Sequence, residues 1–164
     1  MPEKQTIKRA RRDKRQGKAP TTQAGEFVRE EIDHIRKGKH GARSTKQAIA
    51  IGLSKARRSG VELRAPLPGR TSEKTRRSAK AALRRRAGSK PSARQSKAVR
   101  GVLRREGRSA ASRSALSRQA RSVARTRSAG SRKAAARKAV RTKGQRGLTT
   151  AARKAARTRR RKRS

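Results

Sequence analysis

The sequence predicts a mostly α-helical protein with extensive disorder, in which a small helical hairpin at about residues 21–60 is flanked by basic arms. Two observations favour this fold class. First, 53 of the 164 residues are Lys or Arg and only 9 are Asp or Glu, so the formal net charge is +44, while 29% of residues are hydrophobic. Such a chain cannot offset the entropy lost on ordering, and most of it is expected to be disordered when alone. Second, the stretch EFVREEIDHI (26–35) combines four acids, the one phenylalanine and several branched apolar residues.

The distribution of charge divides the chain into three predicted regions. Residues 1–20 carry a net charge of +6 and form a basic N-terminal arm with some nascent helix. Residues 21–65 carry +5 and form the α-helical hairpin module. Residues 66–164 carry +33 and form a Lys/Arg/Ala-rich low-complexity tail. We therefore expect the middle region to fold and the tail to bind a polyanion.

The first helix of the hairpin is predicted from apolar residues at helical spacing. A stripe runs from Ala24 to Ile35 with the period of an α-helix, and Phe27 flanks it. Thr21 or Thr22 is expected to cap this helix, with acids crowding its opening turns, where the helix dipole favours them. The predicted hairpin core comprises Phe27, Val28, Ile32, Ile35, Ile49 and Leu53.

The acids of this helix have different predicted roles. Glu26, Glu30 and Asp33 are expected to project off the apolar face and to offset neighbouring cations. Glu31 falls inside the apolar arc. It therefore either pairs with a basic residue of the second helix, such as Lys55, or lies at the edge of the arc and reaches water.

The second helix is predicted from a capping pattern and a second apolar face. The stretch GKHG (38–41) interrupts the first helix, and Ser44 with Gln47 forms the S-x-x-Q pattern of a capping box. Gly60 is the expected stop. Two amphipathic helices joined by a short glycine turn make a helical hairpin.

The core of this hairpin is too small to be stable by itself. The seven large apolar residues of the hairpin, which are the six of the predicted core and Ile51, contribute about 10–20 kcal/mol if fully buried. Ordering the segment costs more than that, at about 1.5 kcal/mol per residue. Three remedies stay open: self-association into a homo-oligomer through residues 21–60, packing on a further helix, or ordering on a partner.

The tail is predicted to form short Ala/Arg-rich helices separated by glycine, because alanine and arginine are good helix formers. Residues that suit helix starts and stops recur along it. The expected starts are Ser72, Ser92, Ser109, Ser131 and Thr149 or Thr150, and the expected stops are Gly88, Gly107, Gly130 and Gly144.

The charge of the chain predicts double-stranded DNA as the partner. A duplex carries one charge per about 1.7 Å, so the excess of cations matches roughly 22 base pairs. Contacts to the phosphate backbone need no rigid frame and give no sequence preference. A single aromatic residue offers no platform for stacking bases, which disfavours single-strand binding. The predicted DNA-binding residues are Arg76, Arg77, Lys80, Arg84, Arg85, Arg86, Arg100, Arg104, Arg105, Arg132, Lys133, Arg137, Lys138, Arg153, Lys154, Arg157, Arg159, Arg160 and Arg161.

Two other kinds of nucleic-acid partner stay open. The hairpin could be a helix-turn-helix reader of DNA sequence, with Ser44, Thr45, Lys46 and Gln47 as base contacts. An RNA partner, such as the ribosome, suits the same charge. A membrane-active cationic peptide is disfavoured, because no signal segment and only one Phe, Tyr or Trp residue are found.

Other classes of function lack the residues that they need. The chain has no cysteine, and its only histidines, His34 and His40, have no third ligand close by in the sequence, so no metal site and no cofactor is predicted. No nucleophile–base pair suggests an enzyme. No apolar run of membrane-spanning length and no secretory signal occurs, so a cytoplasmic location at the nucleoid, away from membranes, is expected.

A family resemblance points the same way. The segment from Gly25 through Leu83, most specifically GKHGARSTKQAIAIGLSKAR within it, resembles a family of small, basic, poorly characterised bacterial DNA-binding proteins. The tail is similar in composition to the Ala/Lys/Arg-rich tails of histone H1-like nucleoid proteins. The resemblance implies a bacterial nucleoid location, a DNA partner and chromosome condensation. It brings no catalytic residues, and no Ser/Thr-Pro units of eukaryotic linker-histone tails occur.

The charge pattern predicts coupled folding and binding of the tail. Repulsion among its cations should keep helicity low in the free chain at low salt, and duplex DNA should raise it, because phosphates remove the repulsion. Far-UV circular dichroism with and without duplex DNA measures this change. An unchanged spectrum would leave a purely extended polycation.

Overall fold

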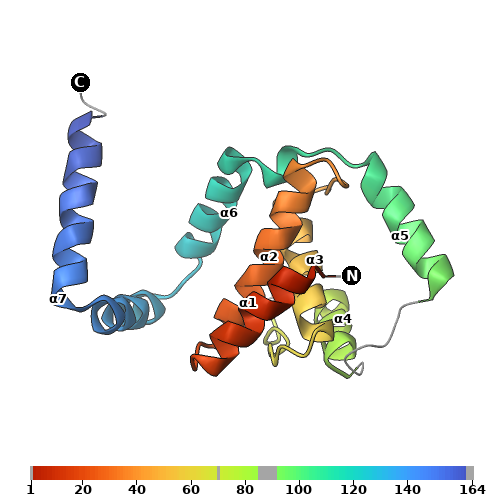
Figure 1. Cartoon of the computed structure of the whole chain (residues 1–164), viewed down its shortest axis with the longest axis horizontal. Helices are drawn as coiled ribbons and strands as arrows, with labels where there is room; N and C mark the ends of the chain where they lie inside the picture. The colour runs from red at the N-terminus through yellow and green to blue at the C-terminus, as the bar shows by residue number, and fades with distance from the viewer. Residues whose placement is uncertain (1, 70, 85–91, 162–164) are drawn as a thin grey trace. The chain divides into compact units, whose positions relative to one another are not determined.

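The computed structural model describes residues 2–69, 71–84 and 92–161, and every regular element within them is helical (Figure 1). The prediction of a mostly α-helical chain is confirmed. The elements are α1 (Lys4–Arg15), α2 (Pro20–Arg36), α3 (Thr45–Arg58), α4 (Glu73–Arg84), α5 (Ala93–Arg105), the 3-10 helix η1 (Ser109–Ala111), α6 (Arg113–Arg125) and α7 (Ala129–Arg161). The chain divides into two compact units, residues 1–119 and 120–164, with the division inside α6.

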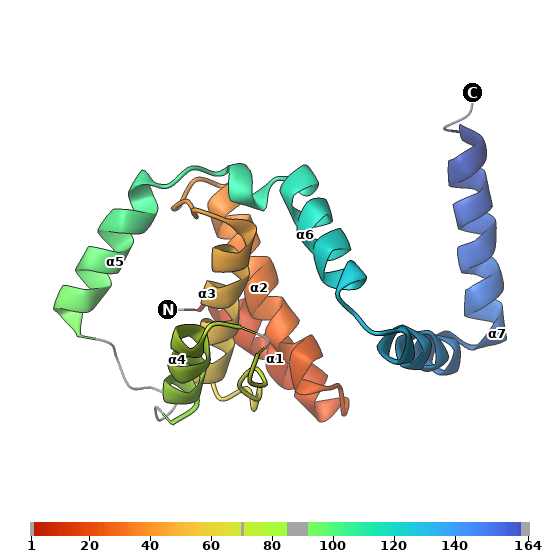
Figure 2. The ribbon, with the colours of Figure 1, turned by 180° about the vertical axis from the view of Figure 1, so that it is seen from behind.

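The hairpin of α2 and α3 forms the centre of the first unit. Helix α1 packs on α2, α4 packs on α3, and η1 touches both α2 and α3. Figures 1 and 2, which are opposite views, both show α1 and α4 beside the hairpin. Of the remedies for a small core, packing on further helices is therefore the one that the structure shows. The unit extends beyond the predicted module at 21–65 in both directions.

Most of the predicted N-terminal arm is helix α1, and it is packed. Thr6, Ala10 and Asp13 are buried on the face that meets α2, and Ile7 adds to the same contact. The packing of this helix could not be predicted from the sequence, because Ile7 is its only large apolar residue. Small side chains and ion pairs carry the packing instead, and neither gives a hydrophobic period.

The hairpin core consists of two clusters. Phe27 lies in the first, with Ala24, Ala56 and Leu63, while Ile32 and Ile35 lie in the second. All three large residues from α2 are buried, and Val28 is half-buried. The other two predicted core residues, Ile49 and Leu53 of α3, are only half-buried.

Helix α3 meets α2 through small residues rather than through its isoleucines. Ala48, Gly52 and Ala56 recur every four residues and are all buried. A Cβ atom built on Gly52 would lie 2.7 Å from Cα of Val28, so the two backbones are in direct contact there. By helical spacing Ile49 and Leu53 belong to the same face of α3, but they are only half-buried, so the small residues form the centre of the contact.

Helix α2 begins earlier than predicted. Pro20 occupies its first turn and Ala19 is the N-cap, without a side-chain hydrogen bond. The expected caps Thr21 and Thr22 are therefore wrong, because both lie inside the helix. No acid is in the first turn, contrary to the prediction. A proline with fixed φ starts a helix well, since its missing N–H is needed by no partner there.

The ends of α3 agree with the sequence. Ser44 is the N-cap, and its Oγ accepts a hydrogen bond from the N–H of Gln47 at 3.2 Å. The Gln47 side chain accepts from the N–H of Arg43 at 2.7 Å, one residue before the cap. Gly60 follows the helix at φ +86, the left-handed conformation that glycine adopts without strain.

A segment from the predicted tail docks on the turn between α2 and α3. The N–H of Gly41 donates to Leu103 at 2.8 Å, and that of Ala42 donates to Gly107 at 3.0 Å. Thr45 Oγ1 donates to the carbonyl of Ala110 at 2.7 Å. A Cβ on Gly41 would overlap the Glu106 carbonyl, so only glycine permits this contact. The docked segment supplies Ala110 and Ala111 to the second cluster.

The helix signals in the tail are right in part. Ser72 caps α4 by accepting from the N–H of Thr75 at 3.3 Å, and Ser92 directly precedes α5. The caps of α6 and α7 are Ser112 and Ser128, which replace the predicted Ser109 and Ser131.

The predictions of helix ends at glycines are also right only in part. Gly107 follows the end of α5, and Gly144 interrupts α7 with φ 62 and ψ 176. Gly130 lies inside α7, so the predicted end of a helix at this residue is wrong. Thr149 and Thr150 lie within α7 and donate to carbonyls four residues back, so they open no helix. Gly88 lies outside the described residues.

The close contact of α2 with α3 predicts that Gly52→Ala destabilises the first unit by about 1–3 kcal/mol, because the new methyl group meets backbone. Urea unfolding of the full chain, followed by circular dichroism, measures the change. Gly25→Ala is the matched control: its Cβ would meet nothing within 4 Å, and alanine should stabilise α2 by about 0.5–1 kcal/mol. Equal effects of the two changes would contradict the close contact.

Candidate nucleic-acid interface

The acids of α2 neutralise cations of the first unit. Glu26 Oε2 lies 2.6 Å from Arg9 Nε of α1, and Glu31 Oε2 lies 2.6 Å from Lys55 Nζ of α3. The predicted pair of Glu31 with Lys55 is therefore confirmed. The prediction that Glu30 projects off the apolar face is wrong: it is 3% exposed, accepts from the N–H of Glu3 at 3.1 Å and lies 3.5 Å from Lys55. Helix α1 covers the face that the sequence assigned to solvent.

A second group of charges joins the start of the chain to the end of α2. Glu3 Oε1 lies 2.8 Å from His34 Nε2 and 3.1 Å from Lys39 Nζ. The hydrogen bonds from His34 and Lys39 lower the pKa of the Glu3 carboxyl to about 2. In the same unit, burial lowers the pKa of Arg57, whose guanidinium donates to the carbonyls of Leu63 and Arg64.

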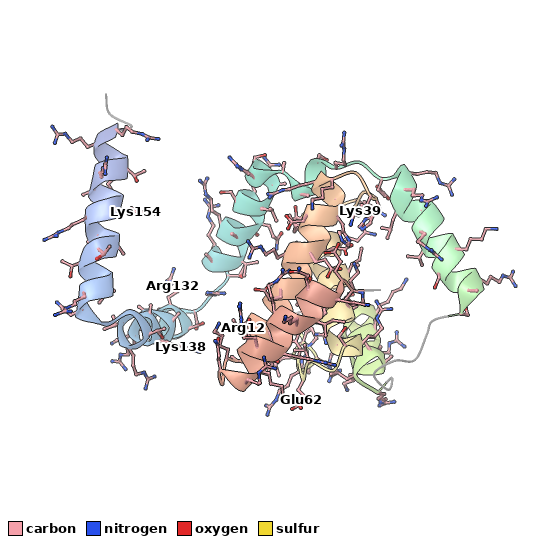
Figure 3. All side chains as sticks on the ribbon, viewed as in Figure 1. Arg12, Lys39, Glu62, Arg132, Lys138 and Lys154 are labelled. Atoms are coloured by element: carbon pink, nitrogen blue, oxygen red, sulfur yellow. The ribbon has the colours of Figure 1, made fainter. Side chains whose placement is uncertain are left out.

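The second unit has the opposite electrostatic character. Residues 120–164 include 18 Lys and Arg and no Asp or Glu. No side-chain carboxylate of this unit can therefore neutralise its cations. Almost every described residue of the unit is exposed, and Figure 3 shows Arg132, Lys138 and Lys154 extending from α7.

Helix α7 has most of its cations on one face in each of its two halves, which meet at Gly144. At 100° per residue, four cations of the first half share an arc of about 140°, and Ala135, Ala136 and Ala139 lie outside this arc. In the second half, six cations share an arc of about 120°, opposite Leu148 and four alanines. The first set is Lys133, Arg137, Lys138 and Arg141, and the second is Arg146, Arg153, Lys154, Arg157, Arg160 and Arg161.

These arcs include most of the predicted contacts in α7 and add two. Arg132 and Arg159 fall outside them, whereas Arg141 and Arg146, which the prediction left out, fall inside. The signal for both was available in the sequence as helical spacing. Along the second half, the cationic face spans about 22 Å at 1.5 Å per residue.

The predicted contacts outside α7 lie on α4 and α5. Arg77, Lys80 and Arg84 are exposed on α4, while Arg76 is half-buried and pairs with Glu73 at 3.2 Å. Exposed positions on α5 are Arg100, Arg104 and Arg105. Arg85 and Arg86 lie outside the described residues.

The residues suggested for reading base edges are engaged within the fold. Thr45 is buried and bound to Ala110, and Ser44 and Gln47 form the cap of α3. Ser44 and Lys46 are both exposed, and of these two Ser44 already serves as the N-cap. The N-terminus of α3 is thus built to hold the docked segment 103–111.

Folding also brings together three metal-ligating side chains that the sequence reading kept apart. One ligand atom each of Glu31, His34 and His40 lies within 4.8 Å of the others. The missed signal is the Glu-x-x-His spacing at 31–34, which places both side chains on one face of a helix. The position of His40 depends on the turn after α2 and could not be predicted from spacing.

Comparison of the chain with protein-family models, with curated proteins and with solved structures finds no match. Within the described part of the chain, no helix combines the length and apolar character that spanning a membrane requires.

The buried ion pair predicts that Lys55→Met destabilises the chain by about 3–5 kcal/mol, because Glu31 is left as an uncompensated buried charge. Urea unfolding of both proteins gives the difference. Lys46→Met on the exposed side of α3 is the control and should change the stability by less than about 0.5 kcal/mol. A loss common to both variants would show that the pair does not matter.

Proposed function

We propose that this chain is a non-enzymatic, histone-like protein that binds duplex DNA largely without sequence specificity and compacts it at the nucleoid. The observation that carries the proposal is the one-sided distribution of cations on both halves of α7, in a unit without acidic residues. A row of cations about 22 Å long can follow phosphates along a groove, while the alanine face needs no partner.

Repulsion within these rows supports coupled folding of the tail. Like charges three or four residues apart on a helix destabilise it by about 0.2–0.5 kcal/mol per pair. Arg153 and Arg157 stand in this relation, as do Arg157 and Arg161. Bound phosphates remove the repulsion, so the free tail is proposed to be largely disordered and to become helical on DNA.

The first unit supports duplex rather than single-strand binding. Its Phe27, the only aromatic residue of Phe, Tyr or Trp type in the chain, is 1% exposed in the core. No such ring is available to stack on a base, and proteins that bind single-stranded nucleic acid commonly stack the bases on such rings. The unit is proposed to anchor the basic helices and to set self-association, and several basic helices on one chain can bridge duplexes.

The alternative is a structured RNA partner, because phosphates in an RNA duplex attract the same cations. Base reading by α3 is a weaker alternative, since three of its four candidate contacts are bonded within the protein. The resemblance to small bacterial DNA-binding proteins adds support to DNA and the nucleoid.

Binding to random-sequence duplex DNA over a salt series tests the proposal. The full chain should bind with a steeply negative slope of log affinity against log salt, and a chain ending at Arg127 should lose most of this affinity, because α7 is removed. Competition with structured RNA separates the alternatives. Retention of tight, sequence-dependent binding by the shortened chain would make the first unit a specific reader.

A charge-neutral rearrangement tests the one-sided face itself. The variant Ala152→Arg, Arg153→Ala, Ala155→Arg, Arg157→Ala keeps the composition but moves two cations to the alanine face. The salt slope should become shallower by about 2, at about 0.9 per lost phosphate contact. Lys154→Arg with Arg157→Lys keeps all cations on the face and is the control. If the rearranged chain binds like the control, net charge alone determines binding.

A further inference from the structure

The cluster of Glu31, His34 and His40 lies in the first unit. Glu31 and His34 belong to α2, and His40 belongs to the turn before α3. Their side chains are 0%, 12% and 19% exposed, respectively. The two imidazole rings meet edge to face, with centroids 6.2 Å apart. Three side chains of ligand type thus converge in a mostly buried place.

The hydrogen bonds of His40 leave one ring nitrogen directed at Glu31. Nδ1 lies 3.1 Å from the carbonyl oxygen of Gly41, which can only accept, so Nδ1 carries the hydrogen. In the neutral ring Nε2 then presents a lone pair, and it lies 3.4 Å from Glu31 Oε1. Two lone pairs facing each other repel unless a proton or a cation lies between them.

One carboxylate oxygen of Glu31, Oε1, is placed to coordinate such a cation. Its Oε2 is paired with Lys55 at 2.6 Å, which leaves Oε1 on the side of the histidines. Among the described residues, no hydrogen bond of good geometry reaches either of these buried oxygens. A carboxylate that is fully buried and lacks hydrogen bonds is costly, and a bound cation would offset this cost.

Both histidines have a hydrogen-bonding partner of the kind that holds a metal-binding histidine in place. Histidines that bind metals usually give their other ring nitrogen to a carboxylate or a backbone carbonyl, which fixes the ring. His34 has Glu3 at 2.8 Å, and His40 has the carbonyl of Gly41. The three carboxylates Glu3, Glu30 and Glu31 are paired with only two lysines, Lys39 and Lys55.

We propose that Glu31, His34 and His40 bind a divalent transition-metal ion of the zinc type. Two imidazole nitrogens and one carboxylate oxygen suit zinc, whereas magnesium and calcium prefer oxygen ligands alone. Ligands of a tetrahedral zinc ion lie roughly 3.3 Å apart, given metal–ligand distances of about 2.0–2.1 Å. The separation of His40 Nε2 from Glu31 Oε1 is close to this value, and His34 completes the set by a small movement.

The site ties the end of α2 to the turn that receives the docked segment. His40 precedes Gly41 and Ala42, whose N–H groups bind Leu103 and Gly107. A metal ion on His40 therefore holds this turn in the conformation that docking requires. The ion is a structural clamp of the first unit, independent of DNA binding by α7.

Titration of the untagged, chelator-treated full chain with zinc chloride at neutral pH, without DNA, tests the site. Isothermal titration calorimetry should show one equivalent bound, with no saturable binding of magnesium chloride, and zinc should raise the melting temperature. Cobalt(II) should show absorption of tetrahedral intensity. A chain that binds no zinc, or a cobalt spectrum identical to that of the aqueous ion, overturns the proposal.

Variants assign the ligands. His40→Ala should weaken zinc binding by at least about 100-fold, and Glu3→Gln by about 10-fold, in line with the effect of outer-shell changes. Asp33→Asn, a half-buried acid of the same helix outside the cluster, should bind zinc like the unchanged chain. Equal zinc affinity of His40→Ala and the unchanged chain overturns the assignment, whatever the stability of the variant.

Discussion

Neutralisation of charge by the carboxylates of α2 is the interaction on which the folded unit depends. In a chain of net charge +44, any compact arrangement brings cations together. Glu26 binds Arg9 of α1, and Glu31 binds Lys55 of α3, so one helix holds its neighbours on both sides. Six of the nine acids of the chain lie before position 34. Their concentration marks the part of the chain that packs against itself.

The second constraint on the first unit is the small size of its side chains. Gly52 and the alanines of α3 let α2 approach to backbone contact, and Gly41 lets the backbone of Glu106 approach in the same way. At these contacts, close packing and backbone hydrogen bonds stabilise the unit in place of the burial of large apolar side chains. A chain with few large apolar residues can fold by this route only if several segments, distant in sequence, meet at the same place.

The two units therefore have different physical characters that suit different tasks. The first unit uses its acids internally, buries its only phenylalanine and brings two histidines to a buried carboxylate. The second contains cations without side-chain carboxylates and has most of the alanines of α7 outside the cationic face. The first is suited to holding a defined shape, and the proposed DNA contacts belong to the second.

The sequence by itself determined the helical class, the hairpin of α2 and α3, the cap at Ser44 and the burial of Phe27, and it limited Glu31 to a pair with a basic residue such as Lys55 or a position at the edge of the apolar arc. These follow from helical spacing, capping chemistry and charge, which act over a few residues or between adjacent helices. The packed α1, the docking of 103–111 on Gly41 and the approach of His40 to Glu31 were decided by tertiary structure. They depend on small residues, backbone groups and the path of a turn, which leave no periodic pattern in the sequence.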